Sequence, residues 1–162
     1  MLAGSPEDPT AYRSMGGRGI PAALGLDRIG KSWDPWGPQS EHVKIFLDLR
    51  EKAHTLVNEV NRLEKIPGGE ARVMKLYAEE PLLSMAKEID AVYKEHKMLR
   101  DWRGAIMEDK TMSIEDQNIM MNYGGPGDNG MGPDRIMVLH AIEANRAILM
   151  AISNWGQMNQ GD

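Results

Sequence analysis

The sequence has no cysteine, one phenylalanine and few aromatic residues, which make up 6% of its 162 positions. Without cysteine the chain cannot form disulfides or thiolate metal sites, which suits a reducing compartment without proving one. No run of 18 apolar residues occurs, so we expect no membrane span. Residues 1–6 lack the basic and apolar regions of a signal peptide.

The chain also lacks a strong excess of charge of one sign. Its net charge is −5, and acidic and basic side chains are mixed along its length. A broad nucleic-acid footprint needs a basic face, and none is evident in the sequence. We therefore expect no specific nucleic-acid site.

No catalytic motif stands out either. Gly125–Gly130 matches G-x-G-x-x-G by letter, but a dinucleotide fingerprint follows a strand, and a helical pattern precedes this one, so we expect a loop. Glu51-x-x-His54 has the spacing of a di-iron helix, which needs a second such helix and two more glutamates. His140-x-x-Glu143 runs in the opposite order. We predict no catalytic residue, no cofactor and no metal site.

Three polar side chains on the predicted helices have specific structural interpretations. His96 falls on an apolar helix seam, where a polar residue often fixes register at some cost in stability. We therefore interpret it as a hydrogen-bonded structural histidine rather than a ligand or base. Arg103 shares that seam and should snorkel or pair with an acid of a neighbouring helix. His54 lies on a polar face and should be solvated.

Helical periodicity is what the sequence has in quantity. Apolar residues at alternating steps of three and four predict long amphipathic helices over about 41–65 and 82–108. Ser40 is the expected N-cap of the first of them. Thirteen methionines in the chain suit irregular helix interfaces. The two seams comprise Phe46, Leu49, Ala53, Leu56, Val60 and Leu63 in the first helix, and Leu82, Met85, Ile89, Val92, His96, Leu99, Arg103 and Ile106 in the second.

Shorter elements follow the first of these helices. A turn at 66–69 precedes a short helix over 70–80, whose residues Val73, Met74, Leu76 and Tyr77 are expected to face inward. Ser113 is predicted to cap a further helix, which meets the glycine-rich loop 123–133. A final helix over about 134–155 carries an apolar stripe wide enough for two partners. The expected fold is all-α: a long antiparallel helical hairpin with a shorter helix and a closing C-terminal helix.

The predicted organisation has three parts: an extended arm over residues 1–39, a helical domain over 40–155 and a polar tail over 156–162. The arm is rich in glycine and proline, which disfavour long regular elements, although Pro21–Leu26 can form one helical turn. Its expected anchors are Trp33 and Trp36. Packing on the chain's own helices and docking on a partner subunit remain alternatives.

Several local motifs follow one another in a distinctive order. They are the tryptophan- and proline-containing entry, Ser40-x-x-Val43-x-x-Phe46-x-x-Leu49, the Gly-Gly turn, Leu76-Tyr77-Ala-Glu-Glu-Pro81-Leu82, Leu99-Arg100-x-x-Arg103-x-x-Ile106, Met112-Ser113-x-Glu115-Asp116 and Asn145. This order resembles a helical module near the C-terminus of large phage and prophage polyvalent proteins, which include internal virion (DNA-ejection) proteins of short-tailed phages. The resemblance covers about residues 33–155 and carries no catalytic residue across.

This resemblance implies a non-enzymatic structural virion protein of a tailed phage, internal or near the portal, that assists genome packaging or ejection. It would be assembled in the host cytoplasm, with copies of itself and other virion proteins as partners. The alternatives are a soluble helical adaptor that binds a partner helix and a small ferritin-like metal protein. The expected assembly interface comprises Trp33, Trp36, Phe46, Leu49, Leu56, Val60, Leu63, Leu82, Ile89, Leu99, Ile142 and Leu149.

Overall fold

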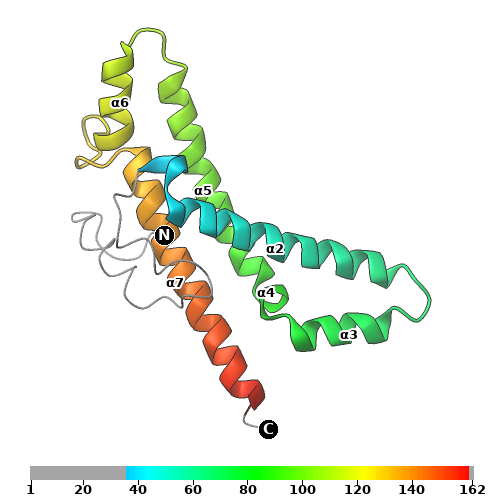
Figure 1. Cartoon of the computed structure of the whole chain (residues 1–162). Coiled ribbons are helices and arrows are strands. Elements are labelled where there is room, and N and C mark those ends of the chain that lie inside the picture. The colour runs from blue at the N-terminus through cyan, green and yellow to red at the C-terminus, as the bar shows by residue number, and fades with distance from the viewer. Residues whose placement is uncertain (1–35, 161–162) are drawn as a thin grey trace.

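The structure is a computed structural model that describes residues 36–160, and over these residues the chain is all-α, as predicted. Six α-helices and one short 3-10 helix form, and this part of the chain contains no strand (Figure 1). The elements are η3 (Gly37–Gln39), α2 (Glu41–Glu64), α3 (Glu70–Glu79), α4 (Pro81–Ser84), α5 (Ala86–Met107), α6 (Ile114–Tyr123) and α7 (Pro133–Gln160).

Helix α2 begins and ends close to the positions that the sequence predicts. The Ser40 side chain caps it by accepting a hydrogen bond of 3.2 Å from the backbone N–H of His42. The chain turns after α2 through Gly68, which has a φ of +80° in the left-handed region. A Cβ on Gly69 would lie 2.0 Å from the backbone oxygen of Leu63, so this turn requires glycine.

Helix α3 then folds back beside α2, and the two form an arm that projects from the rest of the molecule (Figure 1). The chain next breaks at Glu80 and Pro81, where Glu80 is extended and the short α4 begins. Proline lacks a backbone donor and disfavours a helical residue before it, so α3 cannot continue into α5. As a result, α5 leaves this point in a new direction.

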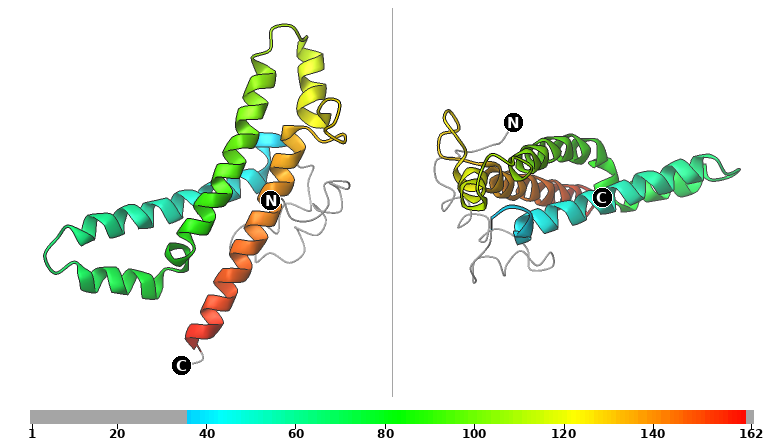
Figure 2. Two further views of the ribbon diagram at one scale, coloured as in Figure 1. Left: turned by 180° about the vertical axis from the view of Figure 1, so that it is seen from behind. Right: turned by 90° about the horizontal axis from the view of Figure 1, so that it is seen from above.

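Because of that break, α2 and α5 do not form one long antiparallel hairpin. We expected the helices over 41–65 and 82–108 to form one long hairpin. Instead, α2 has the short α3 as its antiparallel neighbour, while α5 runs alongside α7 in the opposite direction, and α2 crosses both (Figures 1 and 2).

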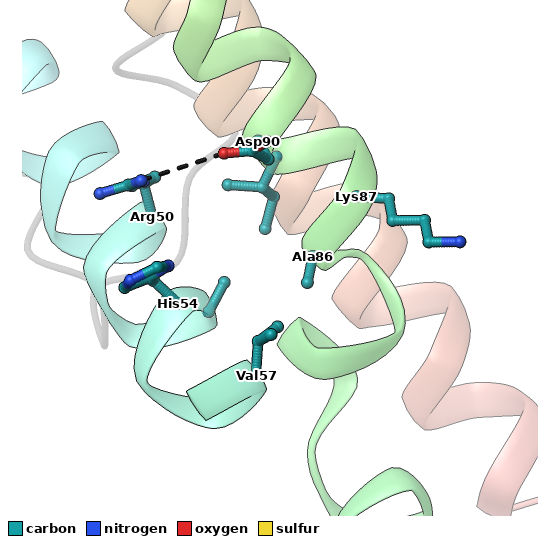
Figure 3. A pocket seen from close by; sticks show the side chains of 8 residues that line it. Arg50, His54, Val57, Ala86, Lys87 and Asp90 are labelled. Atoms are coloured by element: carbon teal, nitrogen blue, oxygen red, sulfur yellow. Dashed lines mark ion pairs between the residues drawn. The ribbon is translucent and has the colours of Figure 1, made fainter. Parts of the chain in front are cut away.

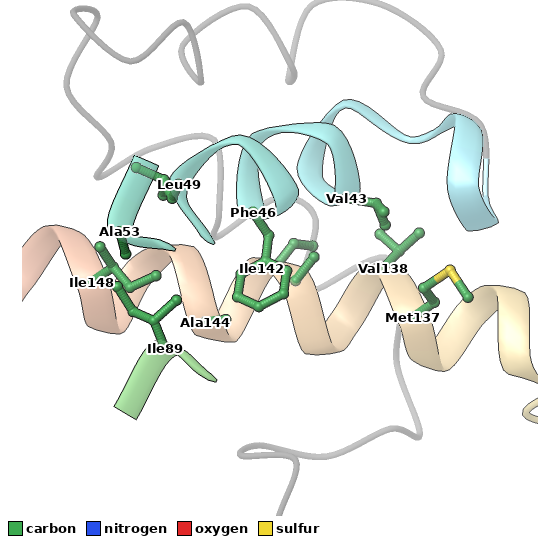
Figure 4. Packing of buried hydrophobic residues seen from close by; sticks show 11 residues of the cluster. Val43, Phe46, Leu49, Ala53, Ile89, Met137, Val138, Ile142, Ala144 and Ile148 are labelled. Atoms are coloured by element: carbon green, nitrogen blue, oxygen red, sulfur yellow. The ribbon is translucent and has the colours of Figure 1, made fainter. Parts of the chain in front are cut away.

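The hydrophobic core lies where α2, α5 and α7 meet. Figure 4 shows Val43 and Phe46 directed from α2 toward Val138 and Ile142 of α7. Phe46 is fully buried, and burying a side chain of this size contributes about 2–3 kcal/mol relative to exposing it. The cluster comprises Val43, Phe46, Leu49, Ala53, Ile89, Met137, Val138, Ala141, Ile142, Ala144 and Ile148.

Helix α7 is the central element of the fold, because η3, α2, α4, α5 and α6 all pack against it. It continues to Gln160, five residues beyond the predicted end at 155, so the predicted polar tail is helical as far as the structure describes it. By length and composition, α7 would also suffice to cross a membrane. However, 56% of its apolar window is buried inside the fold, and the core helix of a globular protein passes the same test.

Candidate functional site

The structure places most residues of the predicted assembly interface in the chain's own core. Trp33 lies outside the described residues. Trp36 is partly buried and packs against the core. The others divide into a buried group of Phe46, Leu49, Val60, Leu63, Ile89 and Ile142, and a partly buried group of Leu56, Leu82, Leu99 and Leu149.

A buried seam stabilises the monomer and is not available to a partner while the fold is intact. The periodicity therefore located helix-packing residues, and the exposed candidates for assembly lie elsewhere. Six of the ten exposed large hydrophobic side chains of the described residues belong to two projecting ends of the molecule, the end formed by α3 with the turn before it and the end where α5 leads into α6 (Figure 1). We define the arm surface as Ile66, Met74 and Tyr77, and the tip surface as Met107, Ile114 and Ile119, all of which are exposed.

Within these two surfaces, Met74 and Ile114 are the most exposed, with relative accessibilities of 73% and 78%. Helix α3 has no fully buried residue at all, although it lies against α2. Single exposed apolar side chains are ordinary, but grouped ones at the ends of projecting helices indicate contact surfaces. Met74 and Tyr77 were expected to face inward on the 70–80 helix, and the structure shows both exposed.

A group of aromatic and histidine rings occupies the point where α2, α5 and α7 cross. The rings of His96 and His140 stack with centroids 6.3 Å apart, and Phe46 lies 5.8 Å from the first and 6.1 Å from the second. Tyr93 stacks on His96 at 6.3 Å. The structural role predicted for His96 therefore fits its position, while the burial of His140 went unrecognised. Its place on the stripe of Met137, Ala141 and Ala144 could have revealed it.

Burial controls the protonation of both histidines. It lowers the pKa of His96 to about 4, with further lowering by His140 and Arg100. Burial likewise lowers the pKa of His140, against the opposing effect of Glu95. Both rings are therefore neutral at pH 7.

These rings do not form a recognisable ligand-binding centre. His140 Nε2 lies 3.4 Å from Glu95 Oε2, close enough for attraction, but the geometry is not that of a good hydrogen bond. The Nδ1 atoms of His96 and His140 have no hydrogen-bond partner among the described residues, so the hydrogen bond expected for His96 is absent at that atom. No group of three or more metal-ligating side chains occurs in the described part of the chain.

Polar contacts join the ends of the long helices. Asp134 at the start of α7 accepts a hydrogen bond of 2.7 Å from Arg103 Nε, which confirms the pairing expected for that arginine. Burial raises the pKa of Asp134, and the nearby Arg103 opposes this rise. Next to it, the Arg135 guanidinium lies over the rings of Trp36 and Tyr123, at 4.9 and 4.6 Å from their centroids.

The glycine-rich segment is a closed loop between α6 and α7, as expected, and its geometry does not resemble a phosphate cradle. Asp128 Oδ2 accepts a hydrogen bond of 2.7 Å from the Gly125 N–H, and the Gly132 N–H donates to the Asn122 backbone oxygen at 3.0 Å. A helix rather than a strand precedes the loop. The Gly125 donor is therefore used within the loop, and the Gly132 donor ties the loop to the end of α6.

Two cavities border α5. The first, of about 280 Å³, lies in the wedge between α2 and α5, over Ala53, Val57, Ala86 and Ile89 (Figure 3). The polar groups at its edge contact one another. Arg50 Nη2 lies 3.9 Å from Asp90 Oδ1, and the Arg50 guanidinium stacks over Tyr93, 4.0 Å from the ring centroid. His54 is exposed, as predicted, and Lys87 extends away from α2.

The second cavity, of about 350 Å³, is a groove between α5 and α7. Glu88 is the one charged residue among those that line it. The α7 side consists mainly of alanines, so the helix backbone is open to close approach by another segment. The lining comprises Met85, Glu88, Ile89, Val92, Ala144, Ala147, Ile148 and Ala151.

Comparison with protein-family models, with curated proteins and with solved structures gave no match for this chain.

Proposed function

We propose that this chain is a non-enzymatic structural protein of a tailed-phage particle, internal or near the portal, that packs in several copies. In that position it assists genome packaging or ejection. The observation that carries the assembly role is the pair of apolar surfaces on projecting helical ends, the arm surface and the tip surface. The phage setting is supported by the resemblance of residues 33–155 to the helical module of polyvalent proteins.

The distribution of polar groups supports a structural role. The buried polar side chains link helices to one another: Asn145 Nδ2 donates to the His42 backbone oxygen at 3.0 Å, and Asp134 pairs with Arg103. Such contacts hold α2, α5 and α7 in a fixed arrangement, which a repeating assembly requires. The exposed methionines at the two ends, Met74 and Met107, suit adaptable contacts because the side chain is flexible and polarisable.

Quantitative mass spectrometry of the phage particles that carry this chain tests the proposal. We expect the chain in genome-filled particles at several copies each. Its loss from particles that have released their genome would assign it to ejection, and equal amounts in both would assign it to a fixed position such as the portal region. Absence from both kinds of particle would overturn the proposal.

A soluble helical adaptor is the second candidate, and the α5–α7 groove favours it. A groove with an apolar floor and an alanine-rich wall can accept an amphipathic helix of a partner. A monomer at all concentrations that binds such a helix with saturation, and that loses binding when Ala147→Trp fills the groove, would favour this function over assembly.

A further inference from the structure

The α5–α7 groove leaves apolar surface uncovered in the middle of the molecule. Ile89 and Ile148 form its floor and belong to the core, whereas Ala147 on its wall is exposed. Alanines at 144, 147 and 151 form most of its α7 wall, and their small side chains leave the groove open. Surface of this kind is stabilised when an apolar segment covers it.

The chain itself contains a segment suited to the groove. The apolar residues of the first 35 positions concentrate in the sequence Ile20-Pro-Ala-Ala-Leu-Gly-Leu-Asp-Arg-Ile29. Ile20 and Leu24 are four residues apart, so one helical turn starting at Pro21 places them on the same side. The alanines beside them keep the segment narrow.

The length of the intervening chain permits this contact. Trp36 stands beside Arg135 near the start of α7, and Ala147 lies twelve residues further along that helix, or about 18 Å at the α-helical rise. The six residues between Ile29 and Trp36 can extend about 20 Å. A segment that ends at Ile29 can therefore lie level with the groove.

The distribution of charge also favours residues 20–29 as the segment that occupies the groove. The first 35 residues contain four basic and four acidic side chains, so residues 36–162 carry the whole net charge of −5. Positions 10–33 contain four basic residues and a single acidic residue, Asp27. Arg28 and Lys31 flank the apolar segment, and Glu88 is the charged residue of the groove. The basic stretch is thus attracted to the acidic body.

We propose that residues 20–29 of the same chain occupy the α5–α7 groove, with Ile20 and Leu24 over Ile89 and Ile148. In this arrangement the segment covers the apolar wall that α5 and α7 leave open. This inference does not depend on the phage setting, because it concerns the chain alone.

Disulfide capture tests the contact directly, because the natural chain has no cysteine to interfere. Ala147→Cys is combined in turn with Ile20→Cys, Leu24→Cys or Leu26→Cys in the full-length protein under mild oxidation. We expect an intramolecular disulfide with at least one of the three partners, since bridged Cα atoms must lie within about 7 Å. The matched control is Met150→Cys on the same helix, which is exposed and does not line the groove.

A second measurement follows thiol accessibility without cross-linking. In the Ala147→Cys protein, alkylation should be about tenfold slower than in Met150→Cys, because the thiol reacts only when the segment opens. Adding Leu24→Asp should remove the difference while circular dichroism stays unchanged. Disulfides between two chains would assign the groove to a second copy. Those disulfides, equal capture at 147 and 150, or rapid alkylation unaffected by Leu24→Asp would each overturn the proposal.

Discussion

His96 and His140 make the stability of the fold dependent on pH. In the unfolded chain a histidine has a pKa near 6.5, whereas burial lowers the pKa of His96 to about 4 and that of His140 in the same direction. Below about pH 6.5 the unfolded state therefore binds protons that the folded state rejects. The free energy of unfolding should fall by about 2 kcal/mol between pH 7 and pH 5 from His96 alone.

Urea unfolding at the two pH values measures this loss. His96→Leu should reduce it, leaving the part that comes from His140, and His54→Gln at an exposed position is the matched control. Asp134 acts in the opposite sense at lower pH, since a carboxyl whose pKa is raised on folding stabilises the protein as it is protonated. An undiminished pH dependence in His96→Leu would contradict the assignment.

Asp134 offers a test of the contact between α5 and α7. Asp134→Ala leaves the Arg103 guanidinium, whose side chain is 26% exposed, without its partner, and we expect a loss of about 2–3 kcal/mol in the free energy of unfolding. The matched control is Asp90→Ala, since that exposed carboxylate makes longer contacts with Arg50 and Lys94 and should cost about 1 kcal/mol or less. Chemical denaturation measures both losses, and equal losses would contradict the prediction that the more buried ion pair contributes more to stability.

At this scale the sequence allowed some residues to be interpreted correctly and others not. The cap at Ser40, the solvated His54 and the acid partner of Arg103 followed from local pattern. The stacking of His96 on His140 did not, because the two residues are 44 positions apart in the sequence and lie on helices that meet only in the folded chain.

At the scale of the helices, replacing each of two glycines by alanine should change the stability of the protein in opposite directions. A Cβ on Gly132 would lie 2.4 Å from the backbone oxygens of Met120 and Met121, so Gly132→Ala must displace α6 from α7. Gly104 lies inside α5 with nothing within 4 Å of the added Cβ, so Gly104→Ala should stabilise the protein by about 1 kcal/mol through helix propensity.

Thermal unfolding of the two variants checks this pair. We expect a lower midpoint for Gly132→Ala and a higher one for Gly104→Ala, relative to the natural chain. A decrease for both would mean that Gly104 serves a contact with another chain, since the monomer offers no steric reason for it.

Element boundaries were largely predictable, whereas the pairing of elements was not. Ser113 marks the start of α6, and its side chain accepts a hydrogen bond from the Asp116 N–H as a cap. The sequence also contains Pro81, but its effect on the direction of α5 depends on the path of the chain through α4 and Glu80. Periodicity records which face of a helix is apolar and does not record which helix covers it.

For the whole molecule, the proposed assembly predicts that the two surfaces can be separated by mutation. Met74→Glu with Tyr77→Glu alters the arm surface, and Ile114→Glu with Ile119→Glu alters the tip surface. All four side chains are exposed, so helicity and the unfolding midpoint should change little. Native mass spectrometry should show that at least one pair of substitutions abolishes the oligomer.

The matched control is Met98→Glu, an exposed methionine on α5 away from both surfaces. An oligomer that survives both double substitutions would exclude the arm and tip surfaces from assembly. The sequence predicted assembly through Leu56 and Leu99, and the structure shows both partly buried. Seam residues and contact residues look alike in a sequence, because both are apolar at helical spacing.

The central place of α7 has a consequence for how the chain is made. Helix α2 leaves the ribosome long before α7, yet much of its core face is covered by α7. Until Pro133–Gln160 emerges, Phe46 and its neighbours lack the partners that α7 supplies, and completion of the core must wait for contacts about 100 positions apart. A nascent chain interrupted before α7 would therefore expose its apolar faces to chaperones and proteases.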